Sequence, residues 1–204
     1  MENGFIYEAA SFVIEGLEKL NLVELFKFLA RKLNPHKRDK IRENAYSRFA
    51  VDIFILLKFI FLAVIWVFGF HGLVLTVFVW YLIIMNLHTY FYRHIWCEDA
   101  VTSANLLLHR VRRRFVNLFL ALTFSNLSFA YLYNLPYASG FNWGTTPPSF
   151  FHAVWFSFSN SVAANYAVVM PVSDLANSVT MIQLMITFIF VTIIISRSLP
   201  QTTP

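Results

Sequence analysis

The chain has 204 residues, of which 58% are hydrophobic and only 13% are charged. Soluble domains carry about 25% charged residues, so this composition indicates a membrane protein. The net charge of +5 comes from lysines and arginines that flank the apolar runs and are absent from residues 69–92 and 116–196. That distribution is typical of a membrane-orientation signal and excludes a nucleic-acid-binding surface. The single cysteine, Cys97, excludes an internal disulfide framework.

Residues 1–48 are predicted to form a cytoplasmic segment, with an amphipathic helix from residue 5 to about residue 33 and a basic collar after it. Apolar residues recur at helical spacing along this helix, acidic residues lie between them, and Asn21 is a candidate interruption. Pro35 ends the helix, and the basic cluster at 37–48 is typical of orientation signals that contact lipid headgroups. The sequence leaves open whether the helix packs in the cytoplasm, lies in the membrane interface or contacts a neighbouring subunit.

Residues 49–92 are predicted to form a transmembrane hairpin, with spans at about 49–69 and 73–90. Lys58 lies inside the first span, and a charge at membrane depth is a candidate functional residue. The alternatives for Lys58 are snorkelling of its ammonium group or pairing with Asp52. Residues 93–114 return to the cytoplasmic side as a linker whose arginines bunch before the next span, which indicates topology anchoring and not a voltage sensor.

Residues 115–198 contain a third span at about 116–135, a fourth at about 175–196 and a short helix between them. Ser149 follows two prolines and is a good N-cap for the short helix. A spanning helix needs about 20 apolar residues, so the short helix is typical of a re-entrant segment. Four spans and one re-entrant loop predict a multi-pass protein of the cell membrane with both termini cytoplasmic, which agrees with the position of every basic cluster.

The segment from Ser149 to Arg197 resembles the pore helix, selectivity filter and inner helix of the tetrameric potassium-channel family. The family pattern is Ala-x-x-Phe-Ser-Phe, then Thr-x-Gly-Tyr-Gly-Asp, and a proline a few residues on. An ungapped alignment matches the family's pore helix, filter tyrosine and final proline with Phe151, Ala153, Trp155, Phe156, Ser157, Phe158, Tyr166 and Pro171. The resemblance covers about the last quarter of the chain, and the third span takes the place of the outer helix.

This resemblance implies a homotetramer in the lipid bilayer that conducts a monovalent cation, K+ or Na+, past rings of backbone carbonyls, with no other cofactor and no metal site. The implied filter is Ala163, Ala164, Asn165, Tyr166 and Ala167, supported by Trp155, Ser159, Asn160 and Val168. The family's filter glycines supply left-handed dihedrals, which Asn165 adopts at modest cost and Ala167 at a cost of about 1–2 kcal/mol. The altered filter therefore favours a cation pathway with weak K+ selectivity, or a collapsed one.

One helical stripe of the fourth span is predicted to line the inner path: Gln183, Thr187, Val191 and Ile195. A ring of Val191 and Ile195 suits a hydrophobic gate that closes by dewetting. The alternative is that some of these residues contact lipid or another helix.

Other constellations do not predict a different chemistry. His94-x-x-Cys97 has metal-ligand spacing, but one short pair is typical of ordinary interfacial residues. No Ser-His-Asp set, phosphate loop or acidic dyad shares one context, so no enzyme is predicted.

The sequence therefore predicts an all-α membrane protein with four transmembrane helices, a re-entrant pore helix with its filter loop, and an N-terminal amphipathic helix. The predicted function is that of a pore-forming subunit of a tetrameric cation channel. The alternative is a non-conducting, channel-derived membrane protein that acts as a structural or regulatory subunit.

Overall fold

The computed structural model describes residues 4–33, 40–97, 108–144 and 147–198. Four helices are long and apolar enough to cross a membrane, at Tyr46–Val67, Leu73–Trp96, Arg112–Asn134 and Asp174–Ile193. They agree with the predicted all-α membrane protein with four spans. The chain divides into two compact units, Met1–Val64 and Ile65–Pro204.

The first unit contains α1 (Phe5–Lys19), α2 (Leu22–Leu33) and most of α3 (Lys40–Val67). Asn21 separates the first two helices and is buried. Its side-chain oxygen accepts a hydrogen bond from the backbone N–H of Val23 at 3.0 Å, as an asparagine at a helix N-cap does. The break considered at Asn21 is therefore present, because this residue caps the start of the second helix.

Within the first unit, α2 packs against α3 through aromatic rings. The ring centroids of Phe26 and Phe54 are 5.0 Å apart. The ammonium nitrogen of Lys58, a buried residue, lies 5.4 Å from the centre of the Phe54 ring. A cation over an aromatic face is attracted by the ring quadrupole, so Phe54 helps to stabilise a charge within an apolar span.

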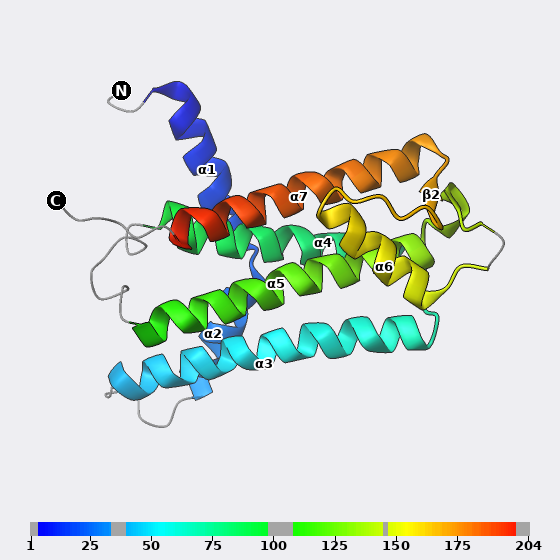
Figure 1. Ribbon diagram of the computed structural model, residues 1–204. Coiled ribbons are helices and arrows are strands. Elements are labelled where there is room, and N and C mark those ends of the chain that lie inside the picture. Colours follow the sequence, from blue (N-terminus) through cyan, green and yellow to red (C-terminus); the bar gives the residue numbers. More distant parts are fainter. Residues whose placement is uncertain (1–3, 34–39, 98–107, 145–146, 199–204) are drawn as a thin grey trace. The chain divides into compact units, whose positions relative to one another are not determined.

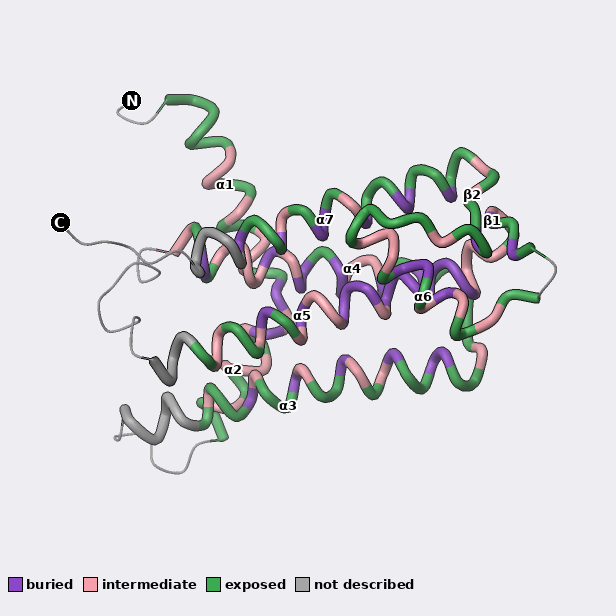
Figure 2. Tube along the Cα trace, viewed as in Figure 1, coloured by how far each residue is buried: buried purple, intermediate pink, exposed green. Residues whose placement is uncertain are grey.

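The second unit is built around α5 (Leu108–Asn134). The helices α4 (Leu73–Phe91), α6 (Phe150–Ser161) and α7 (Asp174–Ser198) all contact α5, and Figure 1 shows them running beside it. Residues 128–134 of α5 are all buried (Figure 2). The C-terminal half of α5 is therefore the core of this unit.

The second span is longer than predicted. It was expected to end at about Tyr90, whereas α4 continues into a π-helix, η1 (Tyr92–Trp96). Ring stacking supports this extension, since Tyr90 stacks on His94 with centroids 5.9 Å apart. The predicted linker 93–114 thus begins inside η1, and its residues 98–107 lie outside the described residues.

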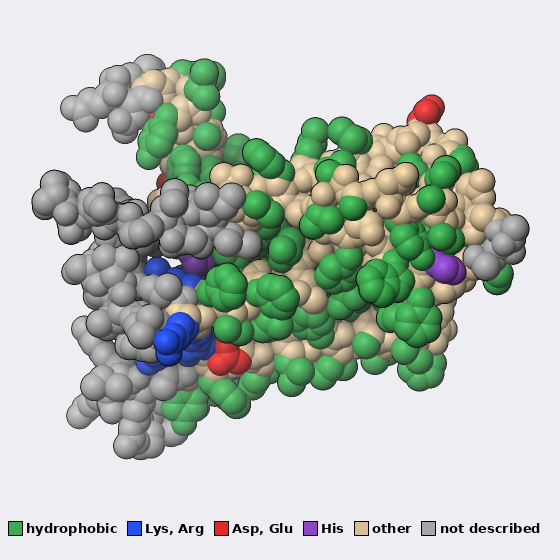
Figure 3. Space-filling view, in the orientation of Figure 1, with side chains coloured by type: hydrophobic (Ala, Val, Ile, Leu, Met, Phe, Trp, Pro, Cys, Tyr) green, Lys and Arg blue, Asp and Glu red, His purple; other side chains and the backbone are tan. Residues whose placement is uncertain are grey.

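Hydrophobic side chains cover much of the face shown in Figure 3, over α5, α6 and α7. Large exposed side chains on the spans include Leu73 and Val74 of α4 and Met185 and Phe188 of α7. A soluble protein rarely exposes so much contiguous apolar surface, whereas lipid tails provide a matching environment for it.

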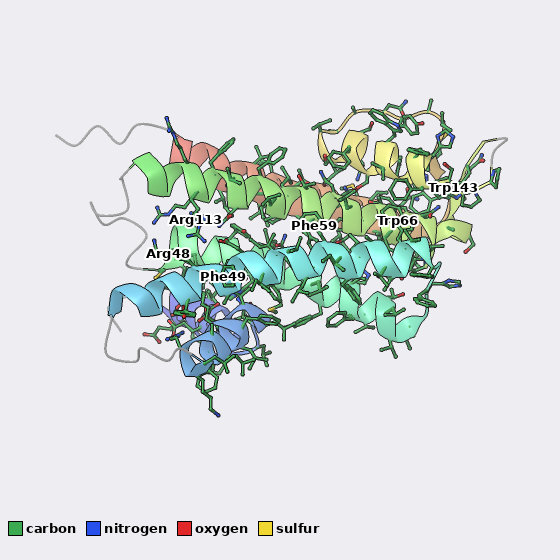
Figure 4. All side chains as sticks on the ribbon, turned by 90° about the horizontal axis from the view of Figure 1, so that it is seen from below. Arg48, Phe49, Phe59, Trp66, Arg113 and Trp143 are labelled. Atoms are coloured by element: carbon green, nitrogen blue, oxygen red, sulfur yellow. The ribbon has the colours of Figure 1, made fainter. Side chains whose placement is uncertain are left out.

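Aromatic side chains gather at the end of the second unit that carries the turn at residues 68–72, which we call the hairpin end. The indole N–H of Trp66 donates to the side-chain oxygen of Asn134 at 2.8 Å. The indole N–H of Trp143 donates to the carbonyl of Ala138 at 3.0 Å, and Figure 4 shows both tryptophans at this end. Such half-polar rings are typical of the membrane–water interface.

A short antiparallel pair of strands closes the segment that contains α6. Strand β1 (Phe141–Asn142), which follows the 3-10 helix η4 (Ala138–Gly140), pairs with β2 (Met170–Pro171). A Cβ atom at Gly140 would lie 2.6 Å from the hydroxyl of Ser173. Glycine therefore fits best where the two ends of the segment meet at the hairpin end, because a larger residue would displace the Ser173 hydroxyl.

Candidate functional site

The short helix α6 begins where the sequence predicted. The hydroxyl of Ser149 accepts a hydrogen bond from the backbone N–H of His152 at 3.5 Å, which confirms Ser149 as the N-cap. The helix has 12 residues. At a rise of about 1.5 Å per residue it is about 18 Å long, too short for the roughly 30 Å hydrocarbon core of a bilayer.

One side of α6 packs against its own chain and the other side is exposed. Ala153, Phe156 and Ser157 are buried, and the Phe156 ring lies 5.2 Å from that of Tyr133 on α5. The exposed side consists of Phe151, Trp155, Phe158 and Val162. Their spacing of four, three and four residues places them on one stripe of the helix.

A buried hydrogen-bond network centred on Gln183 holds α6 to α5 and α7. The side-chain oxygen of Gln183 accepts from the hydroxyl of Tyr133 at 2.6 Å and from the amide of Asn160 at 2.9 Å. Its amide nitrogen donates to the hydroxyl of Ser157 at 2.7 Å, to the carbonyl of Ser157 at 2.9 Å and to the side-chain oxygen of Asn126 at 3.3 Å. Both ends of the fully buried amide are thus satisfied, and a satisfied polar network rigidifies a core instead of costing free energy.

These contacts fix how far α6 reaches along the neighbouring helices. At its start, the Phe150 ring lies 4.4 Å from that of Trp66 at the hairpin end. At its last turn, Asn160 bonds to Gln183, which is nine residues beyond Asp174, the first residue of α7. Nine residues of helix span about 14 Å. Helix α6 therefore runs from the hairpin end to about half-way along the span of α7.

Residues 162–169 form a non-helical loop that leads from α6 back towards the hairpin end. The N–H of Ala164 donates to the carbonyl of Ser159 at 2.8 Å and the N–H of Ala163 to that of Asn160 at 2.9 Å, which is the Schellman pattern of a helix C-terminus. Ala163 has a φ of 55°, the only positive φ at a non-glycine residue in the described chain. Glycine normally occupies this position, so alanine here carries about 1–2 kcal/mol of strain.

The predicted filter residues lie in this loop, and at the positions of the family's glycines its backbone lacks the left-handed dihedrals that glycines supply in the family's filter. Asn165 and Ala167 do not adopt left-handed dihedrals, and the strained residue is Ala163. The physical reason is that the loop starts with a helix-terminating turn, which places the left-handed residue at its first bend. Within the described chain, the backbone N–H groups of residues 165–168 donate no hydrogen bond.

Tyr166 is held to α6 by His152. The tyrosine hydroxyl lies 2.8 Å from Nδ1 of the histidine. Trp155, which the resemblance implied as a filter support, is 61% exposed on the outer stripe of α6 in the single chain. The other predicted supporting residues have separate surroundings. The carbonyl of Ser159 accepts a hydrogen bond in the turn after α6, Asn160 belongs to the Gln183 network, and Val168 is exposed.

The predicted inner stripe of α7 does not share one exposed face. Gln183 and Thr187 are buried inside the chain, Val191 is 39% exposed, and the side chain of Ile195 lies outside the described residues. In the single chain the amide of Gln183 is enclosed by partners from α5 and α6, which is the alternative of helix contact for this residue. The exposed face of α7 passes through Phe188 instead.

Tyr133, Asn126 and His152 also position the site, although this role was not predicted from the sequence. A signal was available for the first two, because polar side chains within spans usually face the protein interior and pair with one another. Asn126 and Gln183 are uncharged polar residues well inside the third and fourth spans. Their pairing through α6 needs the rotation and depth of three helices, which the pattern of each helix alone does not contain.

Comparisons with protein-family models, with curated proteins and with solved structures find no match to this chain.

Proposed function

We propose that this chain is the pore-forming subunit of a homotetrameric cation channel, with α6 as a re-entrant pore helix and residues 163–167 beside the ion path. The observation that carries this proposal is the loop at 165–168, whose backbone N–H groups donate no hydrogen bond within the described residues. This loop lies between the C-terminal end of α6 and the hairpin end. Unbonded backbone is tolerated at membrane depth only inside protein or beside a water-filled path. One chain leaves this loop exposed, so further copies around a central aqueous path provide the environment that it needs.

The orientation of α6 supports a path for cations. Its C-terminal end lies near the half-way level of α7, and the negative end of a helix dipole favours positive charge there. Its exposed stripe from Phe151 to Val162 gives a neighbouring copy an aromatic surface to contact. In this arrangement the protein spans the cell membrane four times with both termini cytoplasmic.

The loop chemistry supports weak discrimination between K+ and Na+. A K+-selective filter replaces the hydration shell of the ion with ordered rings of backbone carbonyls. The loop has no left-handed residue at Asn165 or Ala167 to order such rings. The amide of Asn165, an exposed residue, and water complete the coordination of the ion in this proposal.

Cation flux from purified protein in liposomes tests the proposal. We expect flux of K+ and Na+, and a changed flux ratio in Asn165→Gly and Tyr166→Ala. Val74→Ala is the matched control, because Val74 is an 82% exposed residue on α4 and its truncation should leave the ratio unchanged. A verified tetramer that passes neither ion contradicts the proposed conduction.

A non-conducting, channel-derived subunit is the second candidate function. The loop backbone favours it, because the absence of left-handed dihedrals at Asn165 and Ala167 leaves no alternating set of inward carbonyls. This candidate predicts silent liposomes and co-purification of a separate conducting subunit from native membranes. Flux from the isolated chain excludes it.

A further inference from the structure

Helix α1 carries an apolar face that the other described helices of the first unit leave uncovered. Phe5, Ile6, Phe12 and Val13 are all exposed, Phe12 by 82%, and no residue of α1 is buried. Phe5, Phe12 and Val13 are seven and eight residues apart, so they lie on one side of the helix. An apolar side of this size in one helix marks a contact surface.

Helix α2 has an exposed apolar face of its own, formed by Leu25, Phe28, Leu29 and Leu33. Both faces are exposed in the same chain, so α1 does not cover its own α2. The joint between the helices is held by Asn21, whose side chain bonds to Glu18 and to the backbone N–H of Val23. These bonds fix the break between the two helices.

The two helices carry opposite charge. The three glutamates of α1, Glu8, Glu15 and Glu18, are accompanied by Lys19 alone. The single glutamate of α2, Glu24, is accompanied by Lys27, Arg31 and Lys32. Opposite charge beside complementary apolar faces steers two surfaces together.

An anionic membrane surface is a poorer occupant for α1. Helices that lie in the membrane interface are rich in lysine and arginine on their polar side, and the cytoplasmic leaflet is negatively charged. The glutamates of α1 are repelled by that surface. The basic, apolar surface of α2 attracts them.

We infer that α1 of one copy docks on α2 of a neighbouring copy, so that the first unit links the subunits of the assembly. The lengths match, since helices of 15 and 12 residues extend about 22 Å and 18 Å. This contact between α1 and α2 depends on the oligomer proposed above, but not on ion conduction.

Disulfide crosslinking between two differently tagged, co-expressed chains tests this contact. Both carry Cys97→Ser; one adds Phe12→Cys on α1 and the other adds Leu29→Cys on α2. We expect covalent heterodimers on oxidation in native membranes. Ser11→Cys, on another side of α1, is the matched control and should give few covalent heterodimers. Phe12→Cys homodimers alone, or quenching of a label at residue 12 by lipid-borne quenchers without crosslinking, overturn the inference.

Charge reversal separates this contact from general proximity. Glu8→Lys with Glu15→Lys should lower the crosslink yield by about fivefold, equivalent to about 1 kcal/mol. Arg31→Glu with Lys32→Glu on the other chain should restore it. The mass of the particle in detergent separates the two proposals: a tetramer without the crosslink defeats only the contact, whereas a monomer defeats the oligomer as well.

Discussion

The role of Gln183 leads to a quantitative prediction for Gln183→Leu. Leucine has a similar size but offers neither a donor nor an acceptor. The change removes five hydrogen bonds that join α7 to α5 and α6. We expect the native state to lose stability, and the C-terminal end of α6 to lose its attachment to the middle of α7.

The size of the loss follows from the groups left behind. Five bonds at the average of about 0.6 kcal/mol measured between membrane helices amount to about 3 kcal/mol. The side-chain oxygen of Asn126, a buried residue, loses its bond to Gln183, and an orphaned buried group costs about 1–3 kcal/mol. Both routes indicate a decrease in the free energy of unfolding of about 3 kcal/mol.

Equilibrium unfolding in mixed micelles, followed by helicity, measures this decrease. Thr187→Val is the matched control, because Thr187 is buried one turn further along α7 and outside the network. Its change should stay below about 1 kcal/mol. Tyr133→Phe combined with Gln183→Leu should cost less than the sum of the single changes, because each single change already removes the bond between these two side chains. A Gln183→Leu protein as stable as the parent would refute the network.

Three further predictions concern the loop and the hairpin end. Ala163→Gly should raise the free energy of unfolding by up to about 1 kcal/mol, because relief of the left-handed strain exceeds the added entropy of the unfolded chain. Ala167→Gly has no such strain to relieve and should lower the free energy of unfolding in the same micelle assay. Gly140→Ala should lower the thermal midpoint, since its methyl group overlaps the capping hydroxyl of α7 at a cost of about 1–3 kcal/mol. Tyr166→Phe should lose the 2.8 Å bond to His152, which contributes about 0.5–1.5 kcal/mol to stability. It should also change the K+/Na+ flux ratio. An unchanged flux ratio would show that this bond does not affect the ion path.

Much of the fold follows from local sequence. The four spans are visible as apolar runs of sufficient length, because a chain in lipid must satisfy its backbone within each helix. The starts of two helices could also be predicted from the sequence. Ser149 and Asn21 cap helices through backbone groups two or three residues away, so their effect depends on adjacent residues alone. The exposed stripe of α6 likewise follows from its 3.6-residue period.

The tertiary structure alone decided what those helices do to one another. Gln183 lay on a stripe with Val191 by sequence spacing, yet its amide faces α5 and α6 because Tyr133, Asn160 and Ser157 surround it. The left-handed residue is Ala163, because α6 ends in a Schellman turn there. Helix period and length are properties of one segment. The rotation and depth of a helix are set by partners from other segments, since a buried amide needs donors and acceptors from several helices at once.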